Sequence, residues 1–355
     1  MQQQVRFVTS RDGTRIGWAR HGTGPPLVRV ATWLTNLETD WTSPIWRHWL
    51  TGLGEHFTVV RYDDRGSGLS DRHPADISFE RWIEDLEAVV DGAGLTRFTL
   101  LGMSQAGAVA IAYASRNPSR VDRLVLYGSY ACGARRRDPT AAELEEHELF
   151  LQLMRIGWGR DNPAFGRIFT SEFIPDATDQ QARWLDALQR ASTDGETAAS
   201  MALARSQIDV RDVARSLEVP TLVLHLRDDQ AVPFERGREL AALIPEARLV
   251  PLEGKNHIIL GDDPAWSRFL HELVAFAIGQ RARPGAQDVG GRISARELEV
   301  IHAAAEGKSN EEIAAHMSLS VRTVERHLAN VYTKLGLSGK AARAAAVARL
   351  TRLNS

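Results

Sequence analysis

Cysteine and long apolar runs are nearly absent from this sequence of 355 residues. The one cysteine, Cys132, excludes an intrachain disulfide, favours a reducing compartment, and is expected to be a small buried residue. No apolar stretch approaches the roughly 18 residues that would span a bilayer, and Met1 to Gln4 does not begin a signal peptide. We therefore expect a cytoplasmic protein with no membrane partner.

Clusters of metal-binding residues are also lacking. The histidines, His147, His225 and His271 among them, are scattered along the chain, and most are expected to be solvated or packed. No internal repeat is visible in the sequence. We therefore expect neither a bound metal nor a cofactor.

Charge is distributed unevenly, although the whole chain carries a net charge of only −2. Residues 292–355 hold ten Lys and Arg against six Asp and Glu, a net charge of +4, whereas the remaining residues hold 33 against 39, a net charge of −6. A basic segment attached to an acidic body favours a nucleic-acid-binding module joined to another domain. Residues 281–291 have the composition of a linker, which predicts domains at 1–280 and 292–355.

Short apolar runs alternate with segments of helical periodicity over the first 280 residues. A turn at 11–13 between two extended segments predicts a β-hairpin at the start. The apolar runs are expected to form strands that are buried on both faces: Pro26–Ala31, Phe57–Arg61, Phe98–Leu101, Leu124–Tyr127, Thr221–Leu226 and Arg248–Leu252. The expected helices lie between them: Ser78–Asp91, Gln105–Ser115, Pro233–Leu243 and Pro264–Ile278. This alternation predicts an α/β fold with a mostly parallel sheet and helices on both faces.

One connection, between the strands that end near Tyr127 and begin near Thr221, is far longer than an ordinary crossover. It contains three segments of helical pattern, at 143–156, 179–191 and 196–208. We interpret residues 133–208 as a helical lid over the carboxyl edge of the sheet. Six large side chains either line its inner side or pack on the main domain without a ligand role: Met154, Trp158, Phe165, Phe169, Phe173 and Trp184.

A serine stands at a predicted sharp corner between a strand and a helix. The sequence there is Leu100-Leu101-Gly102-Met103-Ser104-Gln105-Ala106-Gly107. Such a corner lifts the serine hydroxyl clear of the sheet and directs the amino end of the next helix toward a reacting carbonyl. Because the corner is sterically tight, small residues are needed two positions before and two after the serine, where Gly102 and Ala106 stand.

An acid and a histidine follow the serine in the order that this chemistry uses. Asp228 and Asp229 both come directly after one predicted strand, and His257 comes shortly after the next. The histidine would take the serine proton, and the acid would hold its tautomer and stabilise the resulting cation. A lone serine is usually a turn residue and a lone histidine usually structural, but the shared placement after strands favours a triad of Ser104, Asp229 and His257.

These segments resemble the α/β-hydrolase fold over about Val5 to Ile278. The resemblance rests on Gly102-Met103-Ser104-Gln105-Ala106, Asp229-Gln230-Ala231-Val232-Pro233 and Gly254-Lys255-Asn256-His257. Tyr62 to Asp71 resembles the turn after the family's fourth strand, with a backbone role for its glycines. The resemblance implies that the amides of Gln105 and Trp33 form the oxyanion hole. The family commonly has His-Gly where this chain has Ala31-Thr32, and this replacement puts the second oxyanion donor in doubt. Because the loss of one donor costs about two or three orders of magnitude in rate, slow turnover is expected, which would suit a receptor.

The basic tail has the pattern of short capped helices. Serines that begin helices stand at 294, 309, 320 and 338, and two of them have a glutamate at the capping-box position. In the third predicted helix one face is apolar: Val321, Val324, Leu328, Val331 and Leu335. The opposite face carries Arg322, Arg326, Ala329 and Thr333, with Glu325 and Asn330 at its edges. Either this is an ordinary solvated face, or the helix enters a major groove.

The tail resembles the LuxR/GerE type of helix-turn-helix domain over Ile293 to Leu350. The matching segments are Ser294 to Val300, Ser309 to Ala314, Ser320 to Leu328 and Lys334 to Gly336. The resemblance implies DNA binding at promoter half-sites by a homodimer. The expected DNA-contacting residues are Lys308, Arg322, Thr323, Arg326, Asn330 and Lys334, of which Lys308, Thr323 and Lys334 would contact phosphates.

Two functions are compatible with the pair of domains. In the first, the chain is a transcription regulator whose hydrolase-like domain binds a small carbonyl compound such as an ester, a lactone or an acyl conjugate. In the second, it is a working serine hydrolase whose turnover or product controls the DNA-binding domain. A weaker third interpretation is that the body only docks another protein.

Overall fold

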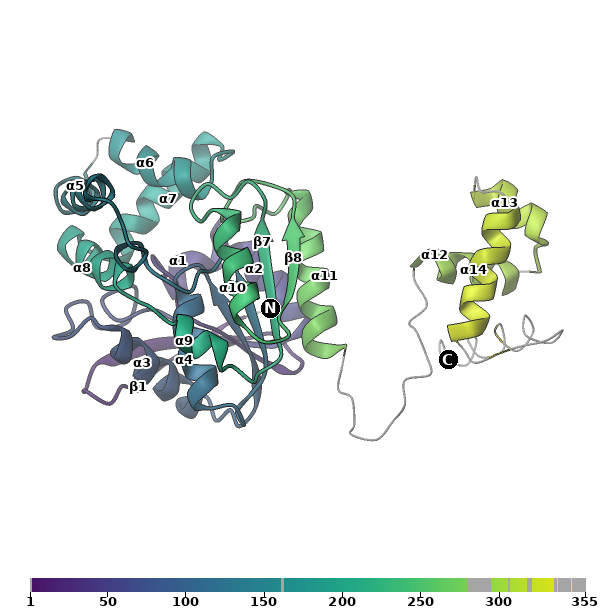
Figure 1. Ribbon diagram of the computed structural model, residues 1–355, viewed down its shortest axis with the longest axis horizontal. Helices are drawn as coiled ribbons and strands as arrows, with labels where there is room; N and C mark the ends of the chain where they lie inside the picture. Colours follow the sequence, from purple (N-terminus) through teal and green to yellow (C-terminus); the bar gives the residue numbers. More distant parts are fainter. Residues whose placement is uncertain are drawn as a thin grey trace. The chain divides into compact units, whose positions relative to one another are not determined.

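The computed structural model describes residues 2–160, 163–279, 295–305, 307–317, 321–334, 337 and 346. Within these ranges some side chains are not described, among them those of Phe169, Arg322, Arg326, Asn330 and Lys334. The proposed linker 281–291 and the expected fourth helix at 338 lie outside the described residues. The chain divides into two compact units, residues 1–280 and 281–355. Figure 1 draws both units.

The first unit contains an eight-stranded sheet with the order β1-β2-β4-β3-β5-β6-β7-β8. β1 and β2 form the predicted antiparallel hairpin, β2 pairs antiparallel with β4, and the remaining pairs are parallel. The strands are β1 (Gln4–Thr9), β2 (Arg15–His21), β3 (Pro26–Arg29), β4 (Thr58–Tyr62), β5 (Phe98–Met103), β6 (Val121–Tyr127), β7 (Thr221–Leu226) and β8 (Arg248–Leu252). All six residues of β5 and of β7 are buried, as expected for strands covered on both faces.

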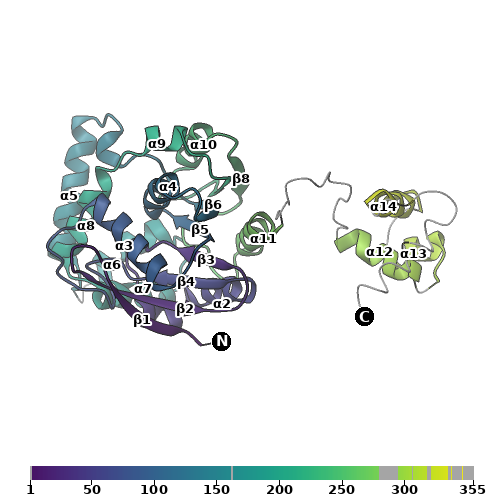
Figure 2. The same ribbon diagram turned by 90° about the horizontal axis from the view of Figure 1, so that it is seen from below.

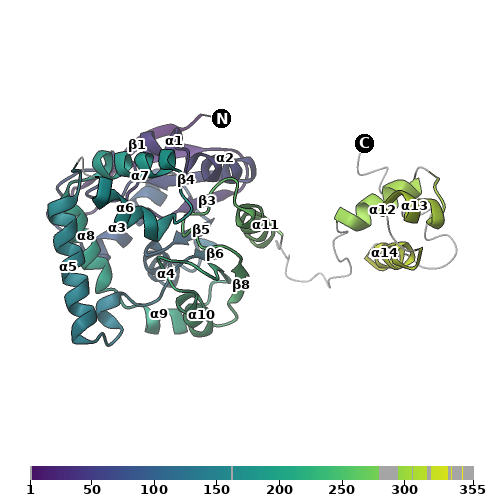
Figure 3. The same cartoon turned by 90° about the horizontal axis from the view of Figure 1, so that it is seen from above.

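Helices cover both faces of the sheet (Figures 2 and 3). One face carries α3 (Phe79–Gly92), α4 (Ala106–Arg116), α9 (Arg211–Arg215) and α10 (Phe234–Leu243). The other face carries α2 (Arg47–His56) and α11 (Pro264–Ile278), with the short α1 (Leu37–Trp41) near β2. Two buried clusters, one on each side of the sheet, form the core of this unit.

Four helices fill the long connection between β6 and β7. They are α5 (Ala141–Gly157), α6 (Pro163–Phe173), α7 (Asp179–Ser192) and α8 (Gly195–Ser206). Three of them coincide with the helical segments predicted from the sequence, and α6 is additional. The threonines at positions 140 and 178 form capping boxes at the starts of α5 and α7. Figure 3 shows these helices grouped on one side of the unit.

The second unit contains three described helices: α12 (Ala295–Ala305), α13 (Asn310–Met317) and α14 (Val321–Lys334). They pack around one small apolar cluster, which includes Val300, Ile313 and Leu328. The side chain of Ser309 accepts a hydrogen bond from the Glu312 amide, and the Glu312 carboxylate accepts one from the Ser309 amide. This is the reciprocal cap that the sequence predicts for the second helix.

Candidate functional site

Ser104 lies in a sharp turn between the end of β5 and the start of α4. Its φ is +52°, a left-handed conformation that residues other than glycine rarely adopt. The Ser104 amide donates to the Tyr127 carbonyl at 2.8 Å, and the Gly107 amide donates to the Ser104 carbonyl at 3.1 Å. These backbone bonds hold the serine at the carboxyl edge of the sheet, at the corner that the sequence predicts.

Small residues around the turn let α4 approach β5. A Cβ atom on Gly102 would lie 2.8 Å from the Cα of Gly107 and 2.9 Å from the Cβ of Ala110. A Cβ atom on Gly107 would lie 2.5 Å from the Oγ of Ser129. Gly102 and the buried Ala106 therefore fill the places expected for them, whereas the requirement at Gly107 was missed because its neighbour Ser129 comes from the end of another strand.

We predict that Gly107→Ala lowers the free energy of unfolding by about 1–3 kcal/mol, because the added methyl group overlaps Ser129. Urea denaturation measures the loss. In the Gly107→Ala/Ser129→Gly double variant the overlap disappears, so its destabilisation should be smaller than the sum of the two single effects. Strict additivity of the two substitutions would contradict this account of the turn.

Asp229 and His257 form a buried pair beyond the ends of β7 and β8. The Nδ1 of His257 lies 2.7 Å from the Oδ2 of Asp229. The Oδ1 of Asp229 accepts hydrogen bonds from the amides of Ala231 at 3.0 Å and Val232 at 2.9 Å. The Tyr127 hydroxyl donates to the His257 carbonyl at 2.7 Å, which fixes the histidine backbone. Both oxygens of the carboxylate are thus engaged, and the ring of His257 is held with Nδ1 toward it.

The geometry separates the two neighbouring acids that the sequence left as alternatives. Asp229 is 6% exposed and contacts His257, whereas Asp228 is exposed and its amide donates to the Gly254 carbonyl. Asp229 is therefore the acid that the fold places beside the histidine.

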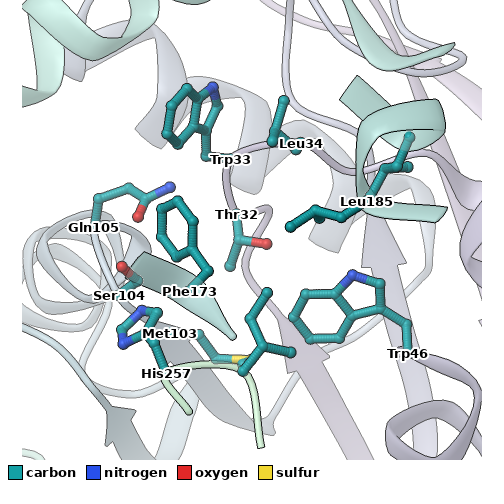
Figure 4. A pocket seen from close by; sticks show the side chains of 12 residues that line it. Thr32, Trp33, Leu34, Trp46, Met103, Ser104, Gln105, Phe173, Leu185 and His257 are labelled. Carbon is teal, nitrogen blue, oxygen red and sulfur yellow. The ribbon is translucent and has the colours of Figure 1, made fainter. Parts of the chain in front are cut away.

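Ser104 and His257 both line one small, mostly apolar chamber (Figure 4). Its volume is about 40 Å³, and Figure 4 shows the serine hydroxyl and the imidazole on the same wall. The described hydrogen bonds do not join these two side chains, and such contacts are often long before a ligand binds. The other residues that line the chamber are Thr32, Trp33, Leu34, Trp46, Met103, Gln105, Phe173, Leu185, Leu188 and Ile258.

The two residues expected to supply oxyanion-hole amides also border this chamber. Gln105 is the N-cap residue of α4 and has helical φ and ψ, so its amide stands at the positive end of the helix. Trp33 follows β3 in the loop Ala31-Thr32-Trp33. Their placement next to Ser104 suits the role, and donation to an oxyanion stays a prediction.

The aromatic side chains of the lid region contribute unequally to the site. Phe173 lines the chamber, and its ring centroid lies 5.8 Å from that of His257. Trp158 stacks on Trp33 at 5.8 Å and donates to the carbonyl of Thr193. The remaining members of the predicted set differ in their environments: Met154 borders a second cavity next to Ser104, Phe165 packs at Gly157, Trp184 packs on the core, and the Phe169 side chain lies outside the described residues.

α14 has the two faces that the sequence predicts for a groove-reading helix. Val324, Leu328 and Val331 are buried in the small core, while Glu325 and Ala329 are exposed on the other side. The expected DNA-contacting positions Arg322, Thr323, Arg326, Asn330 and Lys334 all lie on this helix, and Lys308 precedes α13. Of these six, only the side chains of Thr323 and Lys308 are described, and both are half-buried.

Two features are absent from the described part of the chain. No group of three or more His, Cys, Asp or Glu side chains there is arranged to hold a metal ion. None of the described helices has both the length and the apolar character needed to cross a bilayer.

Comparison with known proteins agrees with both units. Residues 25–264 match the family model described as alpha/beta hydrolase fold, and residues 292–347 match the one described as bacterial regulatory proteins, luxR family. Among curated proteins, the chain is 28% identical over 273 residues to pyrrolizixenacetamide deacetylase of Xenorhabdus hominickii, covering 75% of this chain and 96% of the deacetylase. It is 29% identical over 249 residues to 2-hydroxy-6-oxo-2,4-heptadienoate hydrolase of Pseudomonas putida, covering 64% of this chain and 77% of the hydrolase.

Among solved structures, an esterase from Exiguobacterium antarcticum matches with a TM-score of 0.65 and 25% identity. The match covers 77% of this chain and 99% of the esterase. The enol-lactonase from Burkholderia xenovorans matches with a TM-score of 0.62 and 25% identity. This match covers 76% of this chain and 99% of the lactonase. The chain therefore belongs to the α/β-hydrolase fold family, as predicted from its motifs, and it carries a C-terminal domain of the luxR family of bacterial regulatory proteins.

Proposed function

We propose that this chain is a DNA-binding transcription regulator whose hydrolase-fold domain binds a small carbonyl compound at Ser104. The LuxR-type domain supports DNA binding as the output. In this proposal the chain binds promoter half-sites as a homodimer in the cytoplasm. The ligand is an ester, a lactone or an acyl conjugate. Its carbonyl carbon faces the Ser104 hydroxyl, and its carbonyl oxygen accepts from the Gln105 and Trp33 amides.

The observation that carries this proposal is the buried contact of His257 with Asp229 at 2.7 Å, because His257 lines the same chamber as Ser104, whose backbone has a left-handed φ. An imidazole held in this way accepts the serine proton through Nε2 as the serine attacks a carbonyl. The names of the similar proteins, a deacetylase, an esterase and an enol-lactonase, all refer to reactions at carbonyl groups. A carbonyl compound is therefore the ligand class that the residues favour.

The second candidate is a serine hydrolase whose turnover or product sets the regulatory state. It is supported by the complete set of Ser104, His257 and Asp229 in one site. Ser104→Ala distinguishes the two functions in a reporter strain that contains the target promoter. If ester hydrolysis and regulation are lost together while ligand binding persists, turnover is the signal. If regulation survives and the parent protein hydrolyses no ester, the receptor interpretation holds.

Arg326→Ala should weaken binding to the specific duplex by about 1–3 kcal/mol, because arginine on a recognition helix reads guanine edges. The duplex is first enriched from a random pool by the full chain, and affinity is measured by fluorescence anisotropy at physiological salt. Arg190→Ala is the matched control, since it removes the same charge from an exposed position in the first unit. This variant should bind the specific duplex with the affinity of the parent. Equal affinities of Arg326→Ala and the parent would remove this residue from base recognition.

A further inference from the structure

Ser104 borders a second, larger cavity in addition to the apolar chamber. This polar chamber has a volume of about 260 Å³ and shares Trp33, Ser104, Gln105 and Phe173 with the apolar one. Its own walls carry ionisable side chains that the proposed triad does not use: Arg137, His147, Glu172 and Arg205. A ligand whose carbonyl lies at Ser104 can therefore extend into two cavities, of which the larger offers several ionisable side chains.

Arg205 brings an incompletely satisfied guanidinium to the polar chamber. It comes from the lid helix α8, is only 7% exposed, and has its charged group 4.8 Å from the Trp82 ring. Its Nη2 donates to the carboxylate of Asp64, but its buried Nη1 has no hydrogen-bond partner among the described residues. Because buried donors are nearly always paired, the free Nη1 indicates a place for an acceptor that arrives with the ligand.

Arg137 provides a second guanidinium to the same chamber. It is half-buried, its Nε donates to the Cys132 carbonyl at 2.6 Å, and its charged group lies 5.0 Å from the Tyr130 ring. Burial lowers the pKa of Arg137, and the ion pairs found among the described residues give it no carboxylate partner. A guanidinium so placed has donors available for a carboxylate or a similar planar anion.

We propose that the ligand carries a carboxylate, held in the polar chamber by Arg137 and Arg205, together with a short apolar group for the chamber beside Trp46. This inference rests on the proposed carbonyl-binding function and narrows its ligand to half-esters and other acyl compounds that end in a carboxylate. The apolar group and the carboxylate lie on opposite sides of the carbonyl at Ser104.

Glu172 is the residue that argues for a different ligand. It lies half-buried in the same chamber, and burial alone raises its pKa. A ligand with an ammonium group would pair with Glu172 instead of the arginines. We favour the carboxylate because the described ion pairs give Arg137 no acid, and because Arg205, although paired with Asp64, keeps a buried donor without a partner.

The test measures binding to the full chain carrying Ser104→Ala, which prevents turnover. The probes are the monopropyl esters of succinic, glutaric and adipic acids, each paired with its propyl methyl diester, and titration calorimetry gives the dissociation constants. We expect at least one half-ester to bind tenfold or more tightly than its neutral diester. Propyl esters of ω-amino acids of equal length test the Glu172 alternative.

Substitutions of Arg137 test whether this residue causes the preference for the half-ester. In the Ser104→Ala background, Arg137→Gln should reduce the preference for the half-ester over its diester at least fivefold, and Arg137→Lys should retain part of that preference. Arg190→Gln, at an exposed position, should retain all of it. Circular dichroism verifies that each variant is folded.

The outcomes separate the two claims. Equal affinity for half-ester and diester, or tightest binding of the amino ester, overturns the carboxylate inference and leaves carbonyl binding intact. A half-ester preference that is undiminished in Arg137→Gln also overturns it, since Arg137 would then not bind the carboxylate. If no ester binds at all, the proposed function itself fails.

Discussion

Ser104→Ala should abolish covalent labelling of this chain by a small alkyl fluorophosphonate. The reagent needs a nucleophilic hydroxyl, a base to accept its proton, and donors for the developing oxyanion, all of which the residues around Ser104 are placed to supply. Asp229→Asn should slow labelling by about ten-thousand-fold, because the amide no longer selects the reactive tautomer of His257. Intact-mass spectrometry of the purified chain over time gives the rates.

Ser129→Ala is the matched control for the labelling experiment. Ser129 lies close to the same turn, but its hydroxyl is fully buried and donates to the Tyr127 carbonyl at 3.1 Å. This variant should be labelled at the rate of the parent. Labelling that persists in Ser104→Ala, or a parent chain that is never labelled, would contradict the assignment of the triad.

Arg65→Met should lower the free energy of unfolding of the hydrolase-fold domain by about 3–5 kcal/mol, because it leaves a buried carboxylate without its partner. The Arg65 side chain is fully buried, and its Nε and Nη2 each donate to one oxygen of Asp85 at 2.7 Å. Its Nη1 donates to Asp12 at 2.7 Å and to the Asp76 carbonyl at 2.8 Å. The Arg65 hydrogen bond accordingly holds the pKa of Asp12 well below its usual range.

Arg116→Met provides the comparison for Arg65→Met. Arg116 makes two hydrogen bonds to Glu80, but both side chains are about half exposed. An exposed pair contributes about 0–1 kcal/mol, since water solvates the separated charges. Urea denaturation gives the free energy of unfolding of both variants. Equal destabilisation by the two substitutions would show that burial of the Arg65 network does not determine its contribution to stability.

Most of the sheet was predictable because its central strands are apolar on both faces. Such runs have a length and composition that distinguish them from the amphipathic helices between them, as β5 and β7 show. α6 was not predicted, because Gly166 and three phenylalanines obscure the helical period within its eleven residues. α1 has only five residues and begins at the Asn36 cap, too short for any periodicity to be read.

The residues of the triad could be predicted because each follows a strand, and the carboxyl ends of parallel strands meet at one edge. The ionisable side chains that line the polar chamber could not be predicted. Arg205 meets Asp64 across 141 positions of sequence, and only the docking of the lid on the loop after β4 brings them together. That loop was expected to have a backbone role, and its Gly68, with a φ of +55°, bears this out, yet it also carries the buried Asp64 and Arg65.

The central claim is that occupation of the Ser104 pocket changes DNA binding by the attached domain. The most direct test is the dissociation constant for the enriched duplex before and after stoichiometric modification of Ser104 by the fluorophosphonate, with Ser104→Ala treated in parallel. Coupling between a sensor and its output typically changes affinity by about 5–150-fold. We predict a change of at least tenfold in the parent and none in Ser104→Ala. Identical affinities of the modified and unmodified parent would contradict the account.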